Sequence, residues 1–134
     1  MASLRAFVRG LPDEDFYVSE DAAMEALGAH RPFNVIDMVT GWKADLIVRK
    51  NRPFSVAEFQ GRERAAVLGV DVYVASAEDV VLTKLEWASR GGGSERQLRD
   101  VRGILAARGD LDQDHLAEWA GQLGVEDLLA TVRS

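Results

Sequence analysis

The fold of this chain is decided by SAEDVVLTKLEWASRGGGSERQLRD, residues Ser76–Asp100, read together with KADL, residues Lys43–Leu46. A helix that begins after Ser76 and turns by about 100° per residue places five apolar side chains on one arc: Val80, Val81, Leu85, Trp87 and Ala88. Lys84 falls inside this arc, and an ammonium group on a core-facing stripe is costly unless it meets an anion. Asp45 is the only anion on a strand-like segment beside a second lysine, so we expect it to pair with Lys84.

The composition predicts one globular domain without disulfides. The 134 residues suffice for a modest core, and the hydrophobic and charged fractions, 47% and 28%, are ordinary for a soluble protein. The absence of cysteine excludes disulfides and thiolate metal sites and agrees with a reducing cytoplasm, where we expect this protein. No apolar run predicts a membrane span, and MASLRAFVRG has no signal-peptide pattern. The net charge of −6 argues against strong nucleic-acid binding.

The first half of the chain carries most of the strand signals. Ser19 is a predicted N-cap for a helix that runs through Ala29. Two strand-like runs follow over residues 33–39 and 43–49, with a hairpin-type turn at Thr40-Gly41-Trp42 between them. Alternation along the second run separates two sets of side chains: Lys43, Asp45 and Ile47 on one face, and Ala44, Leu46 and Val48 on the other.

The second half of the chain is predicted to be helical after one more strand. Ser55 and Glu58 indicate a capping box for a helix that opens at Pro53. A short strand over residues 71–75 precedes the helix capped by Ser76. The pattern then predicts a loop and three further helices: Gly91-Gly92-Gly93 as the loop, and helices from Ser94, over 114–123 and over 126–132, the last two separated by Gly124.

These elements predict an α+β chain with a small mixed or antiparallel sheet of about three strands and a helical C-terminal half. We expect a single domain over residues 1–134, with its sheet part at about 15–75 and its helical part at about 76–134. The outer strands of so thin a sheet expose unpaired backbone groups. We therefore expect a homodimer or a partner protein to cover the sheet edge, unless part of the domain is missing.

Four ordered segments resemble bacterial nucleotidyltransferase-fold proteins, most nearly the minimal nucleotidyltransferases and the AbiEii-type toxin proteins. The segments are FNVIDMVTGWKADLIV, RPFSVAEFQGRER, VYVASAEDVVLTKLEWA and SERQLRDVRGIL. The resemblance covers about residues 15–129. It implies a nucleotidyltransferase-like fold and a role in a toxin–antitoxin or defence setting.

The resemblance also implies a nucleotide site that holds a metal ion through three carboxylates. Asp45 matches the third of these carboxylates, which makes it the implied catalytic residue and metal ligand. Lys84 and Asp100 match a lysine and an aspartate that are thought to bind or position the nucleotide, and Lys43 lies beside Asp45. The implied cofactor is Mg²⁺, and the implied ligand is a nucleoside triphosphate.

The chain departs from this family before Asp45. No Gly-Ser turn followed by Asp-x-Asp precedes it, and Asp13-Glu14-Asp15 has only the spacing, because it follows Pro12 outside any clear strand. Two of the three expected metal carboxylates are thus missing, and one carboxylate would hold Mg²⁺ weakly or not at all. We therefore expect a catalytically incomplete nucleotidyltransferase-like protein that acts as a binding or oligomerising module. The alternative is an active metal-dependent nucleotidyltransferase completed by a partner chain or a missing N-terminal segment, so whether the chain is an enzyme stays open.

Each candidate residue also has a purely structural interpretation. Asp45 fits a solvent-facing position on a strand. Lys84 has a side chain long enough to carry its ammonium past its apolar neighbours to water. Asp100 has Arg96 and Arg99 within reach on the same helix surface, where an ion pair contributes little.

Overall fold

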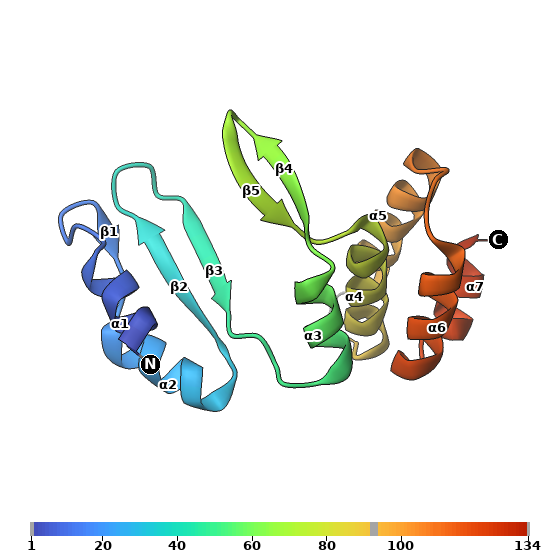
Figure 1. Ribbon diagram of the computed structural model, residues 1–134, viewed down its shortest axis with the longest axis horizontal. Coiled ribbons are helices and arrows are strands. Elements are labelled where there is room, and N and C mark those ends of the chain that lie inside the picture. The colour runs from blue at the N-terminus through green and yellow to red at the C-terminus, as the bar shows by residue number, and fades with distance from the viewer. Residues whose placement is uncertain (1, 92–93, 134) are drawn as a thin grey trace. The chain divides into compact units, whose positions relative to one another are not determined.

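The computed structural model describes residues 2–91 and 94–133, and these residues form an α+β structure (Figure 1). They make seven helices and two small antiparallel sheets, one of three strands and one of two. The α+β class is therefore confirmed. The chain divides into two compact units, residues 1–52 (unit 1) and residues 53–134 (unit 2). Gly92 and Gly93 of the predicted loop lie outside the described residues.

Unit 1 consists of two helices and the three-stranded sheet. Its elements, in chain order, are α1 (Ala2–Arg9), β1 (Phe16–Tyr17), α2 (Glu20–Ala29), β2 (Pro32–Asp37) and β3 (Lys43–Ile47). The sheet order is β1-β2-β3, and both pairings are antiparallel. Ser19 caps α2 as predicted, because its side chain accepts a hydrogen bond from the Ala22 N–H at 3.1 Å. The core of this unit is small: Val8, Ala23, Ala26, Phe33 and Val35.

Asp37 holds the turn that positions β3 against β2. Its carboxylate accepts hydrogen bonds from the Thr40 hydroxyl at 2.6 Å and from the N–H groups of Thr40 at 3.2 Å and Val39 at 2.9 Å. These bonds, the hydroxyl above all, keep the pKa of Asp37 below its ordinary value. Gly41, with φ of 74°, completes the turn that the sequence predicts. The resulting register places Asn34 opposite Asp45.

Unit 2 contains a hairpin and five helices. Its elements are α3 (Pro53–Gln60), β4 (Glu63–Val67), β5 (Val70–Val74), α4 (Ala77–Ser89), α5 (Ser94–Ala107), α6 (Gln113–Leu123) and α7 (Glu126–Arg133). Ser76 caps α4 by accepting from the Asp79 N–H at 3.1 Å, and Gly124 ends α6 with φ of 68°, both as predicted. The predicted capping box of Ser55 is wrong, because α3 already begins at Pro53 and Ser55 lies inside the helix. Proline suits the first position of a helix, because the N–H group that it lacks has no partner within the helix there.

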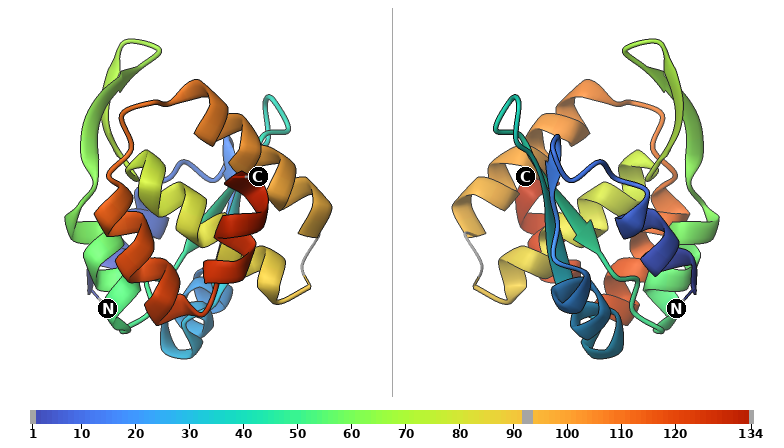
Figure 2. Two further views of the ribbon diagram at one scale, coloured as in Figure 1. Left: turned by 90° about the vertical axis from the view of Figure 1, so that its right-hand side faces the viewer. Right: turned by 90° about the vertical axis from the view of Figure 1, so that its left-hand side faces the viewer.

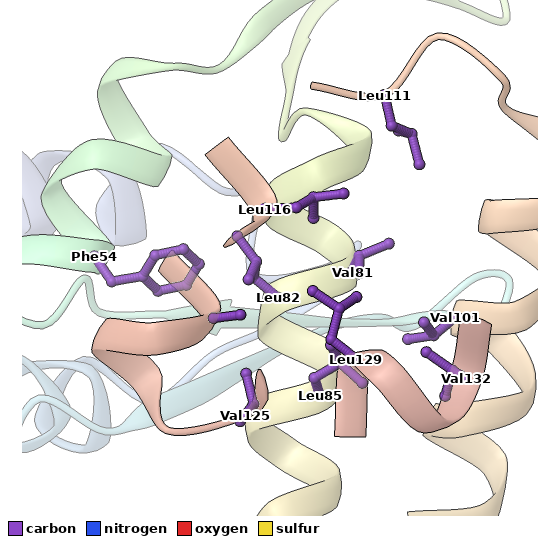
Figure 3. Close-up of a cluster of buried hydrophobic side chains, with 11 residues drawn as sticks. Phe54, Val81, Leu82, Leu85, Val101, Leu111, Leu116, Val125, Leu129 and Val132 are labelled. Atoms are coloured by element: carbon purple, nitrogen blue, oxygen red, sulfur yellow. The ribbon is translucent and has the colours of Figure 1, made fainter. Parts of the chain in front are cut away.

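The core of unit 2 is built around α4. Val81, Leu82 and Leu85 are completely buried, and Figure 3 shows them projecting from α4 among side chains of the surrounding segments. Those side chains come from every other helix of the unit and the connecting loops: Phe54, Val101, Leu111, Leu116, Ala120, Val125, Leu129 and Val132. The buried face of α4 runs through Leu82 rather than Trp87, which is about half exposed. Lys84 consequently lies at the margin of the buried face.

A buried carboxylate ties α4 to α6. Asp79 is almost fully buried in the first turn of α4, and its Oδ1 lies 2.8 Å from Nε2 of His115 on α6. The His115 ring lies beside Trp119, whose ring in turn contacts Phe54 of α3. A buried carboxylate is tolerated only when it is hydrogen-bonded, so this contact fixes how the two helices pack.

The hairpin β4–β5 contains a strand that the sequence pattern did not reveal. β4 pairs antiparallel with β5, with Val67 opposite Val70. Leu68 and Gly69 form the two-residue turn, with φ of 51° and 81°, as a type I′ hairpin turn requires. The sequence predicts one sheet from the strands over residues 33–39, 43–49 and 71–75, and this grouping is wrong. The third of these strands is β5 of a separate two-stranded sheet, and the sheet of unit 1 is completed by β1, which the sequence pattern did not reveal. The outer part of the hairpin stands clear of the helices of unit 2 (Figure 2).

We predict that Leu85→Ala destabilises unit 2 by about 2–5 kcal/mol, because it removes a completely buried side chain and leaves a cavity beside α4. Urea unfolding followed by tryptophan fluorescence measures the loss. Leu68→Ala is the matched control, since Leu68 is 100% exposed and its truncation should change the unfolding free energy little. Equal losses for the two variants would contradict this description of the core.

Candidate functional site

Two of the residues implied by the resemblance, Lys84 on α4 and Asp100 on α5, are in direct contact. Lys84 Nζ donates to Asp100 Oδ2 at 2.7 Å and to Gln97 Oε1 at 3.2 Å. Gln97 and Asp100 are three residues apart and so lie on the same face of α5, which packs against α4. The Lys84 side chain is only 26% exposed, against 40% for Asp100. The half-buried ammonium thus has two acceptors on the neighbouring helix.

This contact corrects the expected pairing of Lys84 with Asp45. The carboxylate that Lys84 meets belongs to Asp100, because α4 and α5 pack side by side and present the two groups to each other. Asp100 is therefore engaged by Lys84 rather than by an arginine of its own helix. Lys84 meets the anion that its position requires, but that anion comes from a neighbouring helix rather than from a strand.

The electrostatics of the pair favour an ionised Asp100. The hydrogen bond from Lys84 is the main cause that lowers the pKa of Asp100, and the charges of Lys84, Arg96 and Arg99 lower it further, while partial burial raises it. Because the folded-state pKa is depressed, the pair stabilises the fold above the ordinary pKa of an aspartate. That stabilisation is lost as the pH falls through the lowered value.

An open groove of about 680 Å³ runs along α4 and α5 beside this pair. Its wall is mostly apolar and carries four charged side chains: Lys84, Arg99, Asp100 and Arg108. Arg108 is engaged by Asp110 at 2.8 Å. Arg99 has no ion pair within the part of the chain that the structure describes, so a cation is free at the rim of the groove. The arrangement suits an anionic ligand that also offers apolar surface.

Asp45 and Lys43 lie on β3 in unit 1, with exposed side chains. Lys43 Nζ lies 3.2 Å from Asp45 Oδ1, and the same oxygen accepts a hydrogen bond from the Asn34 side chain on β2. Asp45 is thus exposed on its strand, as in the purely structural interpretation of this residue. Within unit 1 its immediate partners are an amide and an ammonium group.

The carboxylates of unit 1 do not fit a bound Mg²⁺. Asp13 and Asp15 lie in a turn before β1. Over residues 2–91 and 94–133, no three His, Cys, Asp or Glu side chains gather as metal ligands would. Mg²⁺ needs several oxygen ligands, and the ammonium of Lys43 beside Asp45 opposes a second cation there. The contacts therefore support no catalytic step through a metal.

Two residues that shape these sites escaped the sequence reasoning. Gln97 is the second acceptor for Lys84, and its spacing of three from Asp100 on a predicted helix was the signal that could have revealed it. Asp37 organises the turn before β3, and its place at the start of Asp-x-x-Thr-Gly is typical of a side chain that caps a turn.

Comparisons of the chain with protein-family models, curated proteins and solved structures found no match. Among the described helices, none combines the length and the apolar content that crossing a bilayer requires. A role for Lys84, Asp100 or Asp45 is therefore a proposal that rests on residue types and contacts.

We predict that Lys84→Met raises the pKa of Asp100 toward its ordinary value, because the variant removes the main hydrogen bond and charge that depress it. Carbon-detected NMR titration of the Asp100 carboxyl measures the change. Arg102→Met, on the same helix, removes a positive charge that is not among the causes of this depression, so it should change the titration of Asp100 much less. Identical titration curves in the wild type and Lys84→Met would contradict the contact.

Proposed function

We propose that this chain is a nucleotidyltransferase-like protein that is catalytically incomplete and acts as a binding or oligomerising module. The observation that carries this proposal is the apolar surface of the hairpin β4–β5, which stands clear of the helices of unit 2 (Figure 1). Only Ala75 and Ser76 separate the hairpin from α4, so the segment that exposes this surface is joined to the helix at the centre of the core of unit 2.

The two faces of the hairpin differ in chemistry. Alternation along the strands puts Glu63 and five apolar side chains on one face: Ala65, Val67, Val70, Val72 and Val74. Val67, Val70 and Val74 are exposed, and Leu68 at the tip is completely so. On the other face Arg64 pairs with Asp71 at 3.2 Å, and the Arg62 guanidinium lies over the Tyr73 ring. The polar face is therefore satisfied within the chain, whereas the apolar face is open.

A two-stranded ribbon of this kind is marginal in water. An isolated hairpin needs a third strand or a packed face to be stable, and each of its outer edges carries unpaired backbone groups. Contiguous apolar surface on a small protein marks an interaction site. These properties support a module that is completed by another polypeptide.

The surroundings of Asp45 support catalytic incompleteness. Among the residues that the structure describes, no further carboxylates gather with Asp45 beside Lys43 as a metal-dependent nucleotidyl transfer would require. We expect no transferase activity from this chain alone.

We predict that light scattering of the purified chain gives a mass above the 14.7 kDa of the monomer. Val70→Glu should lower that mass toward the monomer value, because it places a charge on the open apolar face. Val39→Glu is the matched control, since Val39 is a valine in the β2–β3 turn of unit 1 that is even more exposed than Val70. A monodisperse monomer at every concentration would overturn the proposed oligomerisation.

The alternative function is an active nucleotidyltransferase of the toxin–antitoxin or defence type, completed by a partner chain or a further N-terminal segment. The contact between Lys84 and Asp100 beside an open groove favours it, because the resemblance gives both residues a role in placing the nucleotide.

For this alternative we predict that calorimetry detects binding of a nucleoside triphosphate with Mg²⁺, and that Lys84→Ala or Asp45→Ala abolishes it. Lys50→Ala serves as the control, because it removes an exposed lysine outside both sites. No binding at millimolar nucleotide would count against the alternative and leave the non-catalytic module as the better account.

A further inference from the structure

We propose that β5 pairs with β5 of a second copy of this chain, antiparallel and centred on Val72. The result is a four-stranded sheet in the order β4-β5-β5-β4. This inference rests on the proposed role as an oligomerising module, and it names the partner and the strand that makes the contact.

The turn of the hairpin determines which backbone groups of β5 are free. In a two-residue hairpin the residues that flank the turn, Val67 and Val70, exchange both backbone hydrogen bonds. Every second pair along the ladder does the same, so Val72 and Val74 also direct their backbone groups toward β4. The N–H and C=O groups of Asp71 and Tyr73 therefore point away from β4. They form an unpaired outer edge, because the described sheet has only two strands.

The two outer edges of the hairpin are not equivalent. β4 begins with Glu63 and Arg64, and charged side chains of this kind protect an edge strand from pairing. β5 reads Val-Asp-Val-Tyr-Val, with four residues that favour strands and one charge. That charge, Asp71, is already balanced by Arg64 within the chain. β5 is thus the edge that accepts another strand at the lower cost.

Charge and symmetry select the register. Two identical strands that pair about a two-fold axis must place one residue opposite itself. Centring on Val72 puts Asp71 opposite Tyr73 of the second copy, so the outward groups of both residues are satisfied by four hydrogen bonds. Centring on Asp71 instead would set two carboxylates directly opposite each other, which is destabilising. The phenol of Tyr73 then faces a carboxylate that it is able to donate to.

The pairing also remedies the marginal stability of the ribbon. Four strands exceed the three that a small sheet needs. The apolar faces of the two hairpins become continuous across the seam, because Val70 lies opposite Val74 of the second copy on the same face as Val72.

Cysteine substitution tests this register directly, since the chain has no cysteine of its own. Val72 opposite itself is a pair without backbone hydrogen bonds, and the separation of about 4.5 Å between Cα atoms in such pairs suits a disulfide. We expect Val72→Cys to form a disulfide-linked dimer under mild oxidation at least about tenfold faster than Val70→Cys or Val74→Cys alone. A mixture of Val70→Cys and Val74→Cys should also cross-link rapidly.

The controls separate this inference from the proposed function. All three cysteine variants should cross-link at one slow rate in urea, which gives the rate of random encounter. Val72→Lys should convert the oligomer to a monomer, because it sets two ammonium groups opposite each other across the seam. Val67→Lys, on the same face but on β4 and away from the seam, should lower the mass much less. If light scattering shows an oligomer and Val72→Cys cross-links no faster than Val70→Cys, the β5 pairing is overturned and the oligomerising module stands. If the chain is a monomer, both are overturned.

Discussion

Burial of α4 is the interaction on which unit 2 depends. Its residues Val81, Leu82 and Leu85 are enclosed by side chains from the other four helices of the unit and from their connections, so the position of α4 is determined from all sides (Figure 3). The first turn is fixed as well, because the buried carboxylate of Asp79 is bound to His115. The side chains on α4 and the hairpin that leads into it are therefore held in a defined place within unit 2.

Two such features carry the functional proposals. Lys84 lies at the margin of the buried face of α4, where it reaches Asp100 and Gln97 on α5 at the edge of an open groove. The hairpin β4–β5 enters α4 through a short connection at Ser76 and keeps its apolar face and outer edges exposed. The buried helix α4 thus positions both the polar Lys84–Asp100 site and the exposed edge strand β5. The evidence for the hairpin is the stronger, because the free edge of β5 presents N–H and C=O groups with which another strand can pair.

The sequence predicts those elements that are determined by residues close to them in the chain, without help from tertiary contacts. The predicted caps at Ser19, Ser76 and Gly124 are confirmed, because each cap depends on a single side chain or a single backbone conformation next to its helix. β4 escaped because Glu-Arg-Ala-Ala-Val lacks strand alternation, and its pairing with β5 supplies what its own propensity does not. The sequence indicates that Lys84 needs an anionic partner. It does not indicate that this partner is Asp100, because the contact depends on how α4 and α5 pack. That packing is tertiary information, which helical periodicity does not contain.

The central claim is that the chain is completed through the free edge of β5. Amide hydrogen exchange measured over a range of protein concentrations tests it most directly, because it reads individual backbone N–H groups. The account predicts that the N–H groups of Asp71 and Tyr73 exchange rapidly in dilute solution and become protected as concentration rises, while that of Val72 is protected throughout by β4. Rapid exchange at Asp71 and Tyr73 at every concentration would contradict it.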